Sequence, residues 1–525
     1  MGRNTIIFIC IVLVVLSAGI LAYTLFDRKV AIEDCISIER PAAIYPDYSD
    51  IVLPPNIAPL NFVVREDGSR YCVKIYSKQG ENIKIFSRSP KIVVPQKQWR
   101  QLLKLNRGEE MYFDVFVQME KEKWKRFDTI TNKIAHEKID NFLVYRRIHP
   151  GYSTWSKMGV YQRNLQNYDE SLILDNGYYG NGCLNCHTFC QNQPGKMLLG
   201  IRSSIYGSSE LLVEDDKAEK IGTKFGYTSW HPSGRLATYS INKIHLFFHS
   251  AKNEVRGVTD LDSLLAYYIL DSKTVKTSSK FSNKQRLETY PTWSPDGRYL
   301  YFCSAPVLWS DRDTLPQENY DQVRYDLVRV SYDIDRDEWG ELETVLSAED
   351  TNLTILLPRV SPDGRWLLFC MCDYGSFPVY HDTSDLYLLD LTAFEKTGRA
   401  GPQRLHINSN KSESWHSWSS NSRWMAFSSK RQNGVFTRTY FSYLDNEGRA
   451  YKPFLLPQKD PTYYDSCLWT YSVPELVAEP VQVTGETLGR IIRGSEKISV
   501  HLPITMATPK PDAVPGSRQK WYERE

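Results

Sequence analysis

Apolar and polar positions change their spacing several times along this chain of 525 residues. Residues 5–26 form an uncharged, mostly apolar run of 22 residues. At 1.5 Å rise per residue this run is long enough to cross a membrane core about 30 Å thick. Because apolar sequence continues past the weak cleavage site Ser17-Ala18-Gly19, residues 1–29 are predicted to be an uncleaved transmembrane anchor rather than a removed signal peptide.

Residues 30–145 alternate apolar and polar positions in short segments such as Tyr71-Cys72-Val73-Lys74-Ile75-Tyr76, separated by turn residues such as Asp67-Gly68. This period of two predicts a small β-sandwich-like domain, with one short helix at residues 96–105. Residues 146–190 are rich in Tyr, Asn and Gly and show no clear period. They are predicted to form an irregular connector, and an ordered stretch of this kind is usually functional.

A turn motif recurs from residue 191 to about residue 475. Its four copies are Thr228-Ser229-Trp230-His231-Pro232-Ser233-Gly234-Arg235, Pro291-Thr292-Trp293-Ser294-Pro295-Asp296-Gly297-Arg298, Pro358-Arg359-Val360-Ser361-Pro362-Asp363-Gly364-Arg365 and His416-Ser417-Trp418-Ser419-Ser420-Asn421-Ser422-Arg423. The copies are 63, 67 and 58 residues apart, and each precedes an apolar strand. Pro, Asp and Gly suit successive positions of a tight turn.

Four strands per recurrence describe a β-propeller blade, so residues 191–475 are predicted to form five or six blades. Residues 197–221 look like a unit that lacks its first strand, and the segment near Cys467-Leu468-Trp469 is expected to supply it. Residues 476–525 are predicted to be a loosely held tail. The copy at residues 293–298 resembles the repeat of TolB-type propellers, and the likeness covers residues 190–475, although the copy at residues 416–423 lacks both Pro and Gly.

Composition supports a mainly β fold and excludes one class of function. Aromatic residues make up 13% of the chain, and flat rings pack well on pleated sheets. The 64 basic and 62 acidic residues leave a formal net charge of +2. The chain therefore has no basic field with which to bind nucleic acid.

The strongest chemical signal is Cys183-Leu184-Asn185-Cys186-His187, which has the C-x-x-C-H spacing of c-type haem attachment. Two thiols three residues apart bond one edge of the porphyrin, and the adjacent imidazole becomes an axial ligand of the iron. With 10 Cys and 10 His in the chain, chance gives on the order of 0.004 occurrences of this pattern. A zinc site with Cys190, a redox dithiol and a structural disulfide remain alternatives.

The sixth iron ligand is less clearly marked. Met197 is the nearest thioether, although Met197-Leu198-Leu199 also reads as the start of a strand, in which Met fills the core. His231, His245 and His249 are rival ligands, and His231 otherwise reads as a solvent-facing turn residue.

The remaining polar and sulfur-containing residues are expected to be structural. Cys35 and Cys72 are candidates for a disulfide. Cys303, Cys370 and Cys372 are expected to be small buried side chains on strands. The carboxylates of Asp296 and Asp363 belong to turns and are given no catalytic role.

The segments 161–165 and 181–189 resemble the haem-bearing TolB-like proteins of Gram-negative bacteria. The resemblance implies an anchor, a β-domain, one covalent haem c on Cys183 and Cys186 with His187 as axial ligand, and a propeller. Haem c is attached outside the cytoplasm, so the bulk of the chain is expected in the periplasm, tethered to the inner membrane by a single pass.

These features predict a monohaem c-type cytochrome that transfers electrons, with the propeller docking a protein redox partner or a substrate. A haem enzyme of peroxidase or dehydrogenase type is one alternative. A binding or scaffolding propeller with a sensory haem is another. The sequence identifies no catalytic residue.

Overall fold

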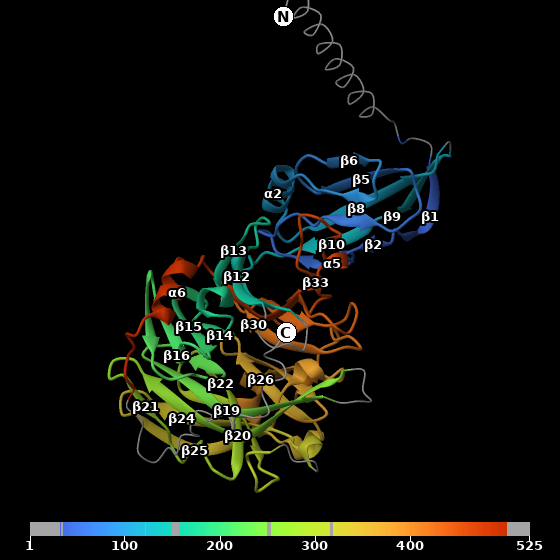
Figure 1. Ribbon diagram of the computed structural model, residues 1–525. Coiled ribbons are helices and arrows are strands. Elements are labelled where there is room, and N and C mark those ends of the chain that lie inside the picture. The colour runs from blue at the N-terminus through green and yellow to red at the C-terminus, as the bar shows by residue number, and fades with distance from the viewer. Residues whose placement is uncertain are drawn as a thin grey trace, which may run out of the picture. The chain divides into compact units, whose positions relative to one another are not determined.

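The computed structural model describes residue 32 and residues 35–120, 122–149, 157–248, 254–314 and 319–500 (Figure 1). The chain divides into two compact units, residues 1–136 with 457–466 and residues 137–456 with 467–525. The anchor predicted at residues 5–26 lies outside the described residues. Within the described ranges, no helix is both long and apolar enough to cross a membrane.

The described part of the first unit contains two β-sheets and two helices. The larger sheet consists of β1 (Cys35–Pro41), β3 (Val52–Leu53), β5 (Arg70–Ser77), β6 (Ile83–Ser87), β8 (Glu110–Gln118), β9 (Trp124–Asp128) and β10 (Ile130–Ile134). The smaller sheet consists of β2 (Ile44–Tyr45), β4 (Phe62–Val64) and β7 (Lys91–Ile92). The helices are α2 (Gln96–Leu105), at the predicted place, and α5 (Tyr463–Ser466).

Helix α2 forms because its apolar residues recur on one face. Trp99, Leu102 and Leu103 are buried, and the Trp99 indole N–H donates to the Ile57 carbonyl oxygen at 3.0 Å. The helix ends where the Asn106 side-chain amide donates to the Leu102 carbonyl oxygen at 2.8 Å. The first unit thus has a core of its own.

The predicted disulfide between Cys35 and Cys72 is wrong, because both cysteines are free. Cys35 begins β1 and Cys72 lies in β5. Strands β9 and β8 separate β1 from β5 in the sheet. Alternation along a strand shows which face a cysteine occupies, but it does not show which strand lies beside it.

The second unit contains six four-stranded sheets, the blades of a β-propeller. Blade 1 is β11 (Phe142–Ile148), β12 (Met158–Asn164), β13 (Glu170–Asp175) and β34 (Thr470–Val477); blade 2 is β14 (Cys183–Cys190), β15 (Gln193–Ser203), β16 (Gly207–Glu214) and β17 (Lys217–Ile221); blade 3 is β18 (Thr228–Trp230), β19 (Leu236–Phe248), β20 (Arg256–Ile269) and β21 (Thr274–Lys276). Blade 4 is β22 (Arg286–Trp293), β23 (Tyr299–Pro306), β24 (Asp326–Asp333) and β25 (Glu338–Leu346); blade 5 is β26 (Thr354–Val360), β27 (Trp366–Cys372), β28 (Asp385–Asp390) and β29 (Gln403–Arg404); blade 6 is β30 (Glu413–Trp418), β31 (Trp424–Ser429), β32 (Arg438–Tyr443) and β33 (Phe454–Leu455). Short helices lie between or after the strands: η1 (Asn176–Tyr179), η2 (Tyr320–Gln322), α3 (Ala348–Thr351), η3 (Pro378–Tyr380), α4 (Leu391–Thr397) and α6 (Gly485–Arg493).

The ring closes differently from the prediction. Strand β34 is supplied from the end of the chain, but it pairs with β11 in blade 1 and lies between β30 and β14. The first strand of blade 2 is β14, the segment that carries the C-x-x-C-H motif. Residues 146–190 therefore contribute strands to two blades, although their sequence predicted an irregular connector.

The repeated turn motif ends the inner strands of the blades. In blade 4 the Ser294 hydroxyl donates to Asp296 at 2.6 Å and accepts from the Tyr299 backbone N–H at 2.9 Å, and Gly297 has φ 73°. Ser361 and Asp363 repeat the first of these bonds in blade 5. Asp296 and Asp363 are therefore turn residues, as predicted. In blade 6 the Gly position is occupied by Ser422, with φ 63°.

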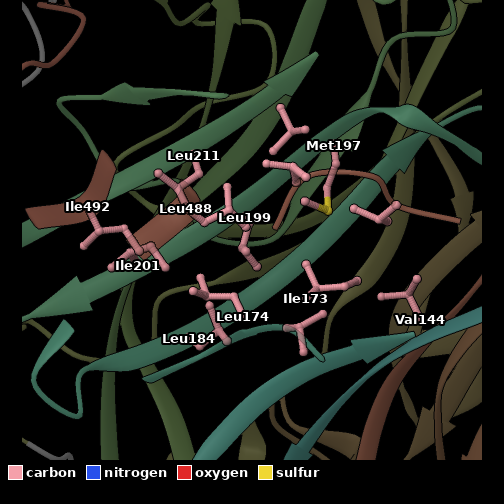
Figure 2. Packing of buried hydrophobic residues seen from close by; sticks show 14 of the residues in the cluster. Val144, Ile173, Leu174, Leu184, Met197, Leu199, Ile201, Leu211, Leu488 and Ile492 are labelled. Carbon is pink, nitrogen blue, oxygen red and sulfur yellow. The ribbon is translucent and has the colours of Figure 1, made fainter. Parts of the chain in front are cut away.

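The C-terminal segment that was predicted to be loosely held is packed up to residue 500. Helix α6 buries Leu488 and Ile492 in a hydrophobic cluster with strands of blades 1 and 2 (Figure 2). Ile498 forms a parallel β-bridge with Ile221 at the edge of blade 2. Residues 501–525 lie outside the described part of the chain.

Candidate functional site

The inner strands of all six blades face the propeller axis. An axial cavity of about 40 Å³ lies between them, with room for about one water molecule. Its lining residues are Cys186, His187, Thr188, Tyr227, Thr228, Tyr290, Pro291, Leu357, Pro358, Arg359, Trp415 and Val473.

Five of the inner strands carry a strained residue at the axial cavity. The left-handed φ values are 43° at Cys186, 53° at Tyr290, 55° at Leu357, 31° at Trp415 and 51° at Val473. At each of these residues the inner strand loses register with its neighbour, as in a β-bulge. Such conformations cost on the order of 1–3 kcal/mol each and cluster at functional sites. The axis is where this fold holds its strain.

The bulge in β14 brings the two motif cysteines to one wall. In an unbroken strand, Cys183 and Cys186 would point to opposite faces because side chains alternate with period two. The register of β14 instead shifts between Asn185 and Thr188. Both cysteines consequently line one larger cavity, of about 250 Å³, which adjoins the axial cavity. We call it the channel-end cavity.

His187 is buried, 2% exposed, and neither its Nδ1 nor its Nε2 makes a hydrogen bond of ordinary geometry. Burial, followed by the positive charge of Arg146, lowers the pKa of His187 to about 3, and weak hydrogen bonding to the backbone of Val144 and Val473 opposes the shift in part. The imidazole is therefore neutral at pH 7 and offers a nitrogen lone pair. Each buried unpartnered polar atom costs about 1–3 kcal/mol, so this pair requires an explanation.

The Cys186 thiol is not prepared for thiolate chemistry. Burial raises the pKa of Cys186 to about 11, although Arg146 lowers it in part. The Cys183 sulfur accepts a hydrogen bond from an Arg202 Nη at 3.4 Å. With its raised pKa, the Cys186 thiol is protonated at neutral pH, which argues against Cys186 as a nucleophile.

The alternative of a zinc site also lacks its ligands. Cys190, the third cysteine of β14, directs its sulfur toward the His231 carbonyl oxygen, 3.8 Å away. Among the described residues, no group of three or more His, Cys, Asp and Glu side chains is arranged to hold a metal ion.

Ionisable groups surround the motif. An Arg146 Nη donates to Asn185, and its Nε donates to the Ser472 hydroxyl at 3.2 Å. Burial lowers the pKa of Lys224 to about 8 and raises that of Glu210 well above its usual range. Strongly shifted groups gathered beside a cavity are typical of functional sites.

The predicted sixth ligand is not brought to this cavity. Met197 is fully buried in the hydrophobic cluster of blades 1 and 2, facing Val144 and Leu199 (Figure 2). His231 is buried in its turn rather than solvent-facing, with its ring nitrogens 2.8 Å from the Ser233 hydroxyl and 3.2 Å from the Gly297 carbonyl oxygen. His245 lies half-buried on β19, and His249 lies outside the described residues. Cys303, Cys370 and Cys372 are buried on strands, as predicted.

Several residues of the channel-end cavity were not found from the sequence, namely Arg146, Tyr227, Arg256, Trp415 and Lys430. One usable signal was overlooked. His187-Thr188-Phe189-Cys190 aligns with His416-Ser417-Trp418-Ser419, so the motif histidine begins a further copy of the blade repeat. That copy lacks Pro, Asp and Gly in its turn, which hid it.

No protein-family model and no curated protein matches the chain. Solved structures that resemble it are a puromycin hydrolase (15% identity, 60% of this chain and 45% of that one, TM-score 0.34) and prolyl oligopeptidase B from Galerina marginata (10%, 65% and 42%, TM-score 0.32). A third is an oligogalacturonate lyase from Vibrio parahaemolyticus (12%, 58% and 92%, TM-score 0.32). The chain spans less than half the length of the first two. These likenesses concern the fold alone.

The prediction of an electron-transfer cytochrome is wrong. Within this chain, Cys183 and His187 are 3% and 2% exposed and face the interior of the propeller. An electron carrier needs its cofactor edge near a surface on which a partner docks, and the motif is not so placed.

Proposed function

We propose that this protein is a β-propeller enzyme whose active site is the channel-end cavity. We further propose that a haem c is held by Cys183 and Cys186, which line this cavity, and by His187, which lines the adjoining axial cavity. One observation carries the proposal: both thiols line one cavity, and the two buried ring nitrogens of the adjacent histidine make no hydrogen bond of ordinary geometry. The finer assignment to haem-bearing TolB-like propellers is part of the same proposal.

The chemistry of these three residues supports the cofactor. Each thioether of haem c forms when a thiol S–H adds across a vinyl group, which requires no oxidant. Cys186, whose pKa burial raises to about 11, carries that S–H at neutral pH. The neutral imidazole of His187 has the free lone pair that an iron ligand needs. Haem would supply an iron centre able to bind a small molecule beside the cavity.

The chain's own residues shape what reaches such a centre. The axial cavity behind the thiols is small, about 40 Å³, and so has little room for solvent. Tyr227 and Trp415 border both cavities, with their ring centroids 5.7 Å apart. Arg146 and Arg202 place positive charge beside the thiols and favour a neutral or anionic ligand. Convergent polar groups in a mostly apolar pocket are the usual form of a small-molecule site.

Location and partners follow from the cofactor. Haem c is attached outside the cytoplasm, so we place the propeller in the periplasm and assign residues 1–29 as its inner-membrane anchor. The partner of the site is then a small molecule that diffuses to the open end of the cavity.

The test is to produce the full chain with the haem-ligation machinery and record its intact mass and pyridine haemochrome spectrum. We expect a mass gain of one haem in the wild type and in Cys190→Ala, a buried cysteine of the same strand. Cys183→Ala with Cys186→Ala should lose it. Wild-type protein without covalent haem would overturn the cofactor assignment.

Two further measurements test the role of the iron. His187→Ala should keep the covalent haem but change the visible spectrum, and added imidazole should restore it. Cyanide should shift the Soret band of the wild type, because an enzymatic iron keeps a position open to small molecules. A Soret band that cyanide does not move would contradict the enzymatic role.

A further inference from the structure

The wall of the channel-end cavity formed by β20 and by the segment after β31 carries two cations on one carboxylate. Glu254 accepts from Arg256 Nε at 2.8 Å and from an Arg256 Nη at 2.8 Å. The same carboxylate accepts from Lys430 Nζ at 2.7 Å. Both cations also lie over the face of Tyr380, with Arg256 at 4.6 Å and Lys430 at 5.5 Å from the ring centroid. The Glu254 carboxylate thus contacts both cations.

These contacts join opposite blades. Arg256 begins β20 of blade 3, and Lys430 follows β31 of blade 6, three blades away in a ring of six. Strands β19 and β20 stay paired beyond the ends of β18 and β21, so their hairpin projects past the four-stranded part of the blade. This projection allows blade 3 to reach Lys430.

The cavity carries an excess of positive charge. Four of its lining residues are cationic, namely Arg146, Arg202, Arg256 and Lys430, and none of its lining residues within the described ranges is Asp or Glu. The Lys430 side chain is only 3% exposed, and burial lowers its pKa even though Glu254 opposes the shift. Buried charges are normally balanced by partners. An anion in the cavity would complete the balance.

The surface next to these cations is apolar. Ile244 and Leu246 alternate along β19 and line the cavity, although they are 43% and 39% exposed. Val258 of β20 and Phe377, before η3, continue this surface. Such exposure of large apolar side chains around a cavity is typical of a binding site. The wall therefore suits a ligand with a flat apolar body and an anionic group.

We infer that Arg256 and Lys430 form an anion subsite of the channel-end cavity, which takes the carboxylate or sulfonate of a ligand whose apolar body lies against Ile244, Leu246 and Phe377. The inference deepens the proposed function because it concerns the same cavity. Lys430 directs one of its three N–H donors at Glu254, which leaves donors for the ligand. The anionic group belongs either to the cofactor's own carboxylates or to a separate substrate.

Two fluorescent probes with similar aromatic ring systems, one anionic and one neutral, test the subsite. Anilinonaphthalene sulfonate carries an anionic group, and N-phenylnaphthylamine has a similar aromatic body without it. In the full chain with Cys183→Ala and Cys186→Ala, Lys430→Met should weaken binding of the sulfonate about tenfold or more, since a charge-assisted hydrogen bond is lost. It should leave binding of the neutral probe unchanged, and Lys430→Arg should retain the sulfonate affinity.

Lys411→Met is the matched control, because Lys411 is also paired with a carboxylate of the propeller, at 2.8 Å from Asp382, but does not line the cavity. Equal sulfonate affinity in Lys430→Met and Lys411→Met would overturn the subsite. Equal weakening of both probes would also overturn it, because a collapsed cavity, and not a lost charge, would then be the cause.

Repeating the titration on protein with both cysteines identifies the source of the anionic group. Sulfonate binding that is blocked in haem-loaded protein but present in the thiol-free variant supports the subsite and assigns its anion to the cofactor. Binding in both forms supports the subsite and assigns the anion to a separate substrate. If no haem is attached at all, the cofactor assignment fails while the Lys430 comparison still decides the subsite.

Discussion

Two histidines occupy equivalent places in two blades and differ in one respect. His187 in β14 and His416 in β30 each follow the left-handed residue of an inner strand, Cys186 and Trp415. Both are buried, and burial chiefly lowers both pKa values to about 3. His416 Nε2 lies 3.1 Å from the Leu368 carbonyl oxygen, and its Nδ1 lies 3.8 Å from the Cys370 sulfur. Neither nitrogen of His187 makes a hydrogen bond of ordinary geometry, although the backbone of Val144 and Val473 interacts with the ring weakly.

This difference in hydrogen bonding indicates that His416 is a structural residue and that His187 is available to bind a ligand. The fold itself supplies partners at this position in blade 6, so nothing in propeller geometry prevents them in blade 2. In blades 1, 4 and 5 the same position is held by Pro474, Pro291 and Pro358, respectively, which have no side-chain polar atom to satisfy. An unpartnered imidazole is therefore not a requirement of the ring. It is a feature of the strand that also carries Cys183 and Cys186.

The largest expected effect concerns stability in a background without the two motif thiols. His416→Leu should lower the free energy of unfolding by about 1–3 kcal/mol, because the buried Leu368 carbonyl loses its donor. His187→Leu should change it by less than about 1 kcal/mol or raise it, because two unsatisfied polar atoms are removed. Urea unfolding followed by tryptophan fluorescence measures both. Equal destabilisation by the two substitutions would end the distinction between the histidines.

A smaller effect tests the lowered pKa that the two histidines share. Their folded pKa of about 3 lies below the value of about 6.5 expected in the unfolded chain. The unfolded state therefore binds the proton first, so stability is complete above pH 6.5 and falls as the pH drops toward 3. Each histidine should cost about 1.4 kcal/mol at pH 5.5 relative to pH 7.5.

His187→Leu and His416→Leu, each in the background without the motif thiols, should each remove one histidine's contribution to this loss of unfolding free energy at low pH. Unfolding curves at the two pH values check this, and the buried carboxyls cancel because both variants retain them. An acid response that only His416→Leu reduces would mean that His187 is already protonated or solvated in the folded protein.

Some of this arrangement was readable from the sequence because it is local. Alternation and the Ser-Pro-Asp-Gly turns predicted the blades, since Asp296 and Gly297 act within a few residues of each other. The C-x-x-C-H spacing singled out β14 for the same reason. The strand itself was missed because its bulge interrupts the period of two that marks a strand.

The closure of the propeller and the composition of the cavity depend instead on contacts between segments that are distant in the sequence. Strand β34 pairs with β11 across more than 300 residues, and Lys430 meets Glu254 across 176. Nothing near Lys430 in the sequence distinguishes it from a solvated lysine. The sequence therefore could not predict the anion subsite, because only the folded ring brings Arg256 of blade 3 close to Lys430 of blade 6.

The smallest expected effect comes from a substitution that usually disrupts a strand. His187→Pro, in the background without the motif thiols, should change the free energy of unfolding by less than about 1 kcal/mol, because three other blades hold proline at this bulge position. The next residue provides the control. Thr188 is paired in register with Leu198, so Thr188→Pro should cost about 3 kcal/mol or more. Urea midpoints compare the two. A large loss in His187→Pro would mean that the imidazole or its backbone N–H supports the strand, and the two unpartnered nitrogens would then no longer indicate a ligand.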